Sequence, residues 1–108
     1  MRQTFLVKHA VGGRMFFDSN KQDFPYTVVP HGNGWRFTVN MPWSKEIEEL
    51  LAHKEELNVF VFREYDDQPT LKTWYYIKDG PVEYDAEQES LTIVADSRIE
   101  YFPHEYSV

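Results

Sequence analysis

The stretch that decides the fold covers residues 26–41 and reads YTVVPHGNGWRFTVNM. From residue 35 to residue 41, apolar and polar side chains alternate with a period of two, which is the pattern of a β-strand with one buried face. Residues 30–34 lie between this strand and the apolar residues 26–29, and they include two glycines and an asparagine. These residue types adopt the positive φ angles of a tight reversal at low cost, so the stretch predicts a β-hairpin.

Further strand patterns flank this hairpin on both sides. Gly12-Gly13 predicts a turn between a strand at residues 5–10 and a short strand at residues 15–17. The polar residues 19–25 predict a loop. Later strands are expected at residues 59–62, 71–78, 82–84, 90–95 and 98–102, with turns at residues 78–81, 85–89 and 96–97. We expect the turn at residues 78–81 to join its two flanking strands in a second hairpin.

Residues 59–62 read VFVF and are apolar at successive positions. A strand without alternation is typical of the centre of a sheet with both faces covered, and we expect that position here.

One segment has a helical pattern. Ser44 can cap free backbone amides, and Glu46 suits the positive end of the helix dipole. Ile47, Leu50 and Leu51 then follow at i, i+3 and i+4 and form one apolar stripe. We predict an amphipathic helix from Ser44 to about Glu56.

Together these elements predict an α+β fold for residues 1–108, taken as one β-rich domain. We expect an antiparallel, strongly curled sheet or a small open barrel of about seven to eight strands, with the helix inserted in the middle of the chain.

Composition excludes several classes of function. The chain has no cysteine, so it has no disulfides, thiolate metal ligands or cysteine nucleophile. Its net charge is −7, and residues 45–108 carry sixteen acidic and only six basic side chains. Phosphate backbones repel such a chain, so we expect no direct binding to nucleic acid. No signal-peptide core and no apolar run of about 20 residues are visible, which predicts a soluble cytoplasmic protein without a membrane contact.

No catalytic or metal-binding motif is present, and we expect neither an enzyme nor a cofactor. The four histidines stand at positions 9, 31, 53 and 104, and no HxxxH or HExxH spacing places two of them on one helical face. His9 is in phase with Phe5 and Val7, so we interpret it as a residue at the edge of the core. His53 falls on the exposed side of the helix. No serine lies in a GxSxG elbow.

The candidate binding surface lies in the strand at residues 71–78. If Leu71, Thr73, Tyr75 and Ile77 face the core, Trp74 and Tyr76 point outward between Lys72 and Lys78. Aromatic side chains with polar rims are typical anchors of binding surfaces. The candidate binding residues are therefore Lys72, Trp74 and Tyr76, together with Glu64 and Tyr65 at the end of the preceding strand. Alternatively, the helix covers this second face and the strand is simply central.

Three functions are open at this level. The first is a non-enzymatic interaction domain that binds a protein partner, or a second copy of itself, through the aromatic strand face and an acidic rim formed by the acidic residues 79–100. The second is a small-molecule binder or modest enzyme, with a pocket between sheet and helix near Glu64, Tyr76 or His9. The third is an acidic mimic of nucleic acid that inhibits a DNA-binding protein.

Overall fold

The computed structural model describes residues 2–78 and 81–102, and within them the chain forms two antiparallel sheets and one helix. Sheet A contains β1 (Arg2–His9), β2 (Met15–Asp18), β5 (Leu57–Glu64), β6 (Leu71–Tyr76) and β9 (Ser97–Tyr101), in the spatial order β2-β1-β5-β6-β9. Sheet B contains β3 (Tyr26–His31), β4 (Gly34–Asn40), β7 (Val82–Asp85) and β8 (Ser90–Ala95), in the order β3-β4-β8-β7. The helix α1 (Lys45–Ala52) connects β4 to β5.

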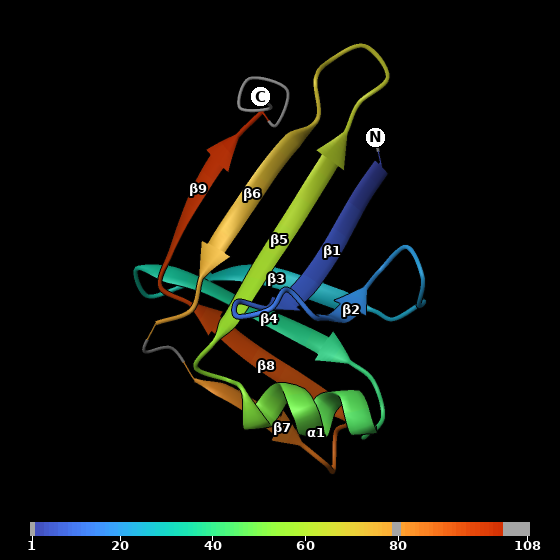
Figure 1. The fold of residues 1–108 in the computed structure, drawn as a ribbon, viewed down its shortest axis with the longest axis vertical. Coiled ribbons are helices and arrows are strands. Elements are labelled where there is room, and N and C mark those ends of the chain that lie inside the picture. Colours follow the sequence, from blue (N-terminus) through green and yellow to red (C-terminus); the bar gives the residue numbers. More distant parts are fainter. Residues whose placement is uncertain (1, 79–80, 103–108) are drawn as a thin grey trace.

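The α+β class and the antiparallel pairing are confirmed, whereas the strongly curled sheet and the open barrel are wrong. The strands divide between two separate hydrogen-bonded sheets, and neither sheet closes into a barrel. In Figure 1, β1, β5, β6 and β9 run steeply past β3, β4 and β8, which cross behind them. Two layers form because each sheet presents an apolar face to the other, and stacking these faces removes both from water.

The first predicted hairpin is confirmed. β3 and β4 pair from Tyr26 opposite Val39 to His31 opposite Gly34, and Gly32 has a φ of 58° in the turn. The turn at Gly12 and Gly13 is confirmed too, because β1 pairs with β2 and both glycines have positive φ.

The second predicted hairpin is wrong. β6 pairs with β5 and β9 in sheet A, whereas β7 pairs with β8 in sheet B. Residues 79 and 80 of the expected turn lie outside the described residues. The connection between β6 and β7 therefore carries the chain from one sheet to the other. The chain returns from β8 in sheet B to β9 in sheet A through Asp96, whose backbone amide donates to the Tyr76 carbonyl oxygen at 2.9 Å.

The helix starts as predicted and ends about one turn early. The Ser44 hydroxyl accepts a hydrogen bond from the Ile47 amide at 3.3 Å, and Ile47 and Leu50 are buried. His53 is the C-cap, and the Glu56 amide donates to the His53 carbonyl oxygen at 2.8 Å. This tight turn redirects the chain into β5, so residues 53–56 cannot continue the helix.

The core lies between the sheets and includes residues of both. Its fully buried residues come from alternate positions of the strands, as the period of two predicts. They include Phe5 and Val7 of β1, Val59 and Val61 of β5, Tyr75 of β6, Phe37 and Val39 of β4, and Leu91 and Ile93 of β8. Ile47 and Leu50 of α1 complete one end of the same cluster. Within the described ranges, no helix combines the length and apolar composition needed to cross a bilayer.

Candidate interaction surface

The two faces of sheet A have different surroundings. One face packs on sheet B, and the opposite face, called the outer face below, points toward the viewer in Figure 1. Strand register fixes which residues share it. Leu6, Phe60, Trp74 and Ile99 lie side by side in one row across β1, β5, β6 and β9. The four side chains form an apolar band across the sheet.

Two further rows flank this band on the outer face. The first row contains Thr4, Phe62, Lys72 and Tyr101, and the second contains Lys8, Asn58, Tyr76 and Ser97. Three neighbouring strands thus present aromatic side chains to the same side.

No helix or strand of the described residues covers the outer face. In Figure 1 the helix α1 lies beyond the lower end of sheet A, and its buried residues belong to the core cluster. The alternative in which the helix covers Trp74 is therefore wrong. β5 is central in its sheet as predicted, but its second face is not covered by another layer. Phe60 and Phe62 are half-buried by the side chains around them, whereas Ile99 is 49% exposed.

The aromatic side chains of the outer face hold one another in place. The Trp74 indole N–H donates to Asn58 Oδ1 at 3.1 Å, and its ring centroid lies 4.6 Å from that of Tyr76 and 5.7 Å from that of Phe60. The Lys72 ammonium nitrogen lies 4.4 Å from the centroid of the Phe60 ring, and it also approaches the rings of Phe62 and Tyr101. Such cation–π contacts keep a charged group among aromatic rings.

The charges of the outer face are arranged around Lys72. Arg2 lies opposite Glu64 across the β1–β5 pair, at the end of the sheet. Asp18 lies at the β2 edge, where its carboxylate accepts a hydrogen bond from the Asn20 amide at 2.8 Å. Both carboxylates are thus peripheral, whereas the Lys72 ammonium group reaches from its flanking row over the Phe60 ring of the apolar band.

The acidic residues expected to form a rim lie mainly elsewhere. Glu83 and Asp85 belong to β7, and Glu87 and Glu89 to the turn that follows it, so all four lie on the edge of sheet B. Glu100 lies on the opposite face of β9 from Ile99 and pairs with Arg98 at 3.2 Å. Sequence proximity to β6 therefore gives no proximity to Trp74, because the chain changes sheets between the two.

The structure places the five sequence-predicted binding residues unequally. Lys72, Trp74 and Tyr76 lie together on the outer face, and Glu64 marks its end. Tyr65 follows β5 outside the strand and is half-buried. Sequence reasoning missed Leu6, Phe60, Phe62 and Ile99, which complete the face. No local signal tells which strands become neighbours of β6, and the successive apolar residues 59–62 predicted that both faces of their strand are covered.

An open hollow of about 610 Å³ adjoins the second flanking row of the outer face, which contains Asn58, Tyr76 and Ser97. Its walls come from the start of β5, the end of β6, the start of β9 and the turn before β5. Its lining residues are Ala10, Glu55, Glu56, Leu57, Asn58, Tyr76, Ile77, Lys78, Asp96 and Ser97. The pocket expected between sheet and helix was placed near Glu64, Tyr76 or His9. Tyr76 lines this hollow, whereas Glu64 and His9 do not.

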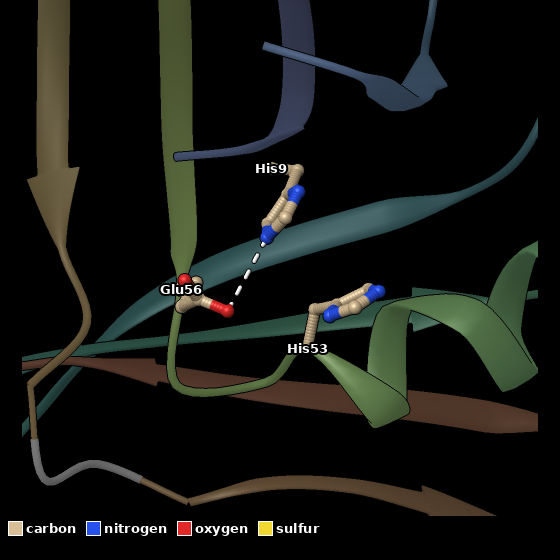
Figure 2. Close-up of side chains that lie close together, drawn as sticks. All are labelled: His9, His53 and Glu56. Carbon is tan, nitrogen blue, oxygen red and sulfur yellow. Dashed lines mark hydrogen bonds and ion pairs between the residues drawn. The ribbon is translucent and has the colours of Figure 1, made fainter. Parts of the chain in front are cut away.

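A second cluster was also missed. His9, His53 and Glu56 lie close together at the end of β1, the C-cap of α1 and the turn before β5, and in Figure 2 the His9 ring is directed at Glu56. Histidine spacing in the sequence gives no sign of this cluster, because His9 is more than forty positions away from His53 and Glu56 and meets them only through the fold.

Comparison with known proteins gives no further guide, since no protein-family model matches the chain and neither a curated protein nor a solved structure is significantly similar to it.

Proposed function

We propose that this chain is a non-enzymatic protein-interaction domain that binds its partner through the outer face of sheet A. The observation that supports this most is the row of Leu6, Phe60, Trp74 and Ile99, which no described element covers. A continuous apolar and aromatic surface costs free energy in water unless a partner covers it, so such patches mark interaction sites.

The arrangement of the rings suits a protein partner. Trp74 is held by Asn58 and by the neighbouring rings, so little side-chain entropy is lost when a partner packs on it. Tryptophan and tyrosine at the centre of a patch contribute most of the binding energy in many interfaces. The face of a sheet is also broad, and it offers area rather than a deep cavity.

The partner's chemistry follows from the position of Lys72. A partner that places a carboxylate beside an apolar surface would meet the ammonium group at the centre of the face. A second copy centred on the same rings would instead bring two Lys72 side chains together, which costs binding energy. We therefore assign the face to a different protein with an apolar and acidic docking surface.

The test uses Ile99→Glu on β9 and Lys72→Glu on β6. Ile99→Glu places a charge into the apolar band, and Lys72→Glu reverses the central charge. Proteins captured by the wild-type chain from a lysate of its source are identified, purified and titrated calorimetrically. Each variant should weaken binding of a true partner by about 2 kcal/mol, or roughly thirtyfold in Kd.

Val29→Glu is the matched control, because Val29 is 37% exposed and lies on the edge strand β3 of sheet B. It should leave affinity unchanged. The proposal fails if both glutamate variants bind as tightly as the wild type, or if Val29→Glu weakens binding equally. A wild-type dimer that Ile99→Glu dissociates would assign the face to a second copy instead.

The hollow beside Tyr76 favours a second candidate function, the binding of a small molecule. Its volume of about 610 Å³ falls within the usual range of ligand pockets, roughly 300–1,000 Å³. A fragment screen followed by NMR should then shift the amide signals of Asn58, Tyr76 and Ser97. Shifts confined to other parts of the chain would exclude this hollow as the binding site.

A further inference from the structure

His9, His53 and Glu56 form a compact group of metal-binding side chains at the junction of β1, α1 and β5 (Figure 2). Each residue offers one ligand atom, and the three atoms lie within 4.8 Å of one another. Two imidazoles and one carboxylate are a donor set that suits Zn²⁺ and related transition-metal ions.

The distance between two of the three ligand atoms fits a single ion. The Nε2 atom of His9 lies 3.4 Å from Glu56 Oε1. Two ligand atoms bonded tetrahedrally to zinc at about 2.05 Å are separated by about 3.3 Å, so this pair already spans one edge of a coordination tetrahedron. The rings of His9 and His53 are stacked with centroids 4.5 Å apart. Imidazole nitrogens bind a metal ion in the plane of the ring, so the exposed His53 ring must turn out of this stack before its nitrogen can bind the same ion.

The backbone beneath the cluster is fixed by hydrogen bonds that belong to the fold. The Ala10 amide donates to the Glu56 carbonyl oxygen at 2.7 Å, which ties the end of β1 to the turn before β5. The Glu56 amide donates to the His53 carbonyl oxygen at 2.8 Å, and His53 itself closes the helix. The three Cα positions are thus set before any ion binds, which lowers the entropy cost of assembling a site.

The ligand atoms are accessible from solvent. The His9 side chain is 16% exposed and that of Glu56 is 48% exposed, so an ion can reach the cluster without opening the core. Three protein ligands leave a fourth tetrahedral position for water.

We propose that His9, His53 and Glu56 bind one Zn²⁺ ion, which cross-links the end of β1, the C-terminus of α1 and the start of β5. The cross-link joins segments that are far apart in sequence, so it stabilises the folded chain relative to the unfolded one. This inference is independent of the outer face of sheet A.

The experiment titrates Zn²⁺ into the full chain, prepared without a polyhistidine tag and freed of metal by a chelator. Calorimetry should show one ion per chain, and the melting temperature should rise with Zn²⁺. Mg²⁺ in the same titration should bind at least a hundredfold more weakly, because it prefers oxygen ligands.

Two variants remove ligands, and each has a matched control. His53→Ala and Glu56→Gln should each weaken Zn²⁺ binding at least tenfold and abolish the rise in melting temperature. His31→Ala removes an exposed histidine at the end of β3, and Glu55→Gln neutralises the neighbouring carboxylate, so both should bind Zn²⁺ like the wild type. Absence of saturable binding by the wild type would overturn the proposal, as would equal losses in variants and controls.

Discussion

At the scale of single residues, Tyr84 joins the edge of sheet B to the segment before the helix. Its hydroxyl donates to the Met41 carbonyl oxygen at 2.9 Å, and its ring meets the Trp43 ring edge-on with centroids 5.3 Å apart. Desolvation raises the pKa of Tyr84 above its ordinary value of 10.0, and the carboxylates of Glu89 and Asp85 raise it further. The neutral phenol is therefore the form that the fold favours.

This shift predicts a pH-dependent stability difference between the wild type and Tyr84→Phe. Below pH 10 the variant should be less stable than the wild type, because it lacks the hydrogen bond to Met41. Above that pH the unfolded chain loses its phenolic proton before the folded chain does, so the wild type's advantage should shrink. Urea unfolding of both proteins at about pH 7 and pH 11 measures the difference. An advantage that grows with pH would contradict the assignment.

The direction of the Lys72 side chain can be predicted from the sequence, but its contacts cannot. Its outward position next to Trp74 follows from the period of two within one strand. Its contacts with Phe60, Phe62 and Tyr101 do not follow from that period, because Phe60 and Phe62 belong to β5 and Tyr101 belongs to β9. Local alternation determines direction, whereas strand pairing determines neighbours.

At the scale of elements, the β3–β4 hairpin contains two glycines with different roles. Gly32 lies in the turn with φ of 58°, and a Cβ there would meet no atom within 4 Å. Gly34 begins β4 and is buried, and a Cβ on it would overlap the carbonyl oxygen of Ala95 in β8. The sequence indicated both as turn residues, since the approach of β8 cannot be read from the hairpin alone.

The two positions predict different costs for an alanine. Gly34→Ala should destabilise the protein by roughly 2–3 kcal/mol, because β4 and β8 must separate to admit the methyl group. Gly32→Ala should cost roughly 1–2 kcal/mol, the usual penalty for an L-residue in the left-handed region. Midpoints of urea unfolding compare them. A Gly34→Ala protein as stable as the wild type would show that β4 and β8 do not approach as described.

At the scale of the whole molecule, one face of β6 is buried between the two sheets and the other belongs to the outer face of sheet A. Tyr75 is 1% exposed between the sheets, where its ring packs edge-on against Phe37 and Trp35. Tyr76, the next residue, lies on the outer face beside Trp74. Substitutions of these two adjacent tyrosines therefore show which face of sheet A is buried.

Tyr75→Ala should cost about 3–5 kcal/mol, because it leaves a large cavity between the two sheets. Tyr76→Ala should cost about 1 kcal/mol or less, since water can occupy the space that the ring vacates. Thermal melts of both variants and the wild type provide the comparison. Equal losses of stability would mean that the outer face is covered in the folded protein.

The sequence by itself determined the local structure of this protein. Alternation identified most strands, the glycines identified the turns at residues 12–13 and 32, and Ser44 identified the start of the helix. These features depend on φ, ψ and burial patterns within a few residues, so neighbours along the chain are sufficient to specify them.

Only the tertiary structure decided which strands share a sheet, which face of sheet A lies inside, and which distant side chains meet. β1 pairs with β5 although the β3–β4 hairpin and the helix lie between them in sequence, and β6 and β7 belong to different sheets although the residues between them predict a turn. The same long-range pairing assembles the aromatic outer face and brings His9 to Glu56. Pairing over such separations depends on how the whole chain buries its apolar surface, and this free energy is not encoded in any one segment.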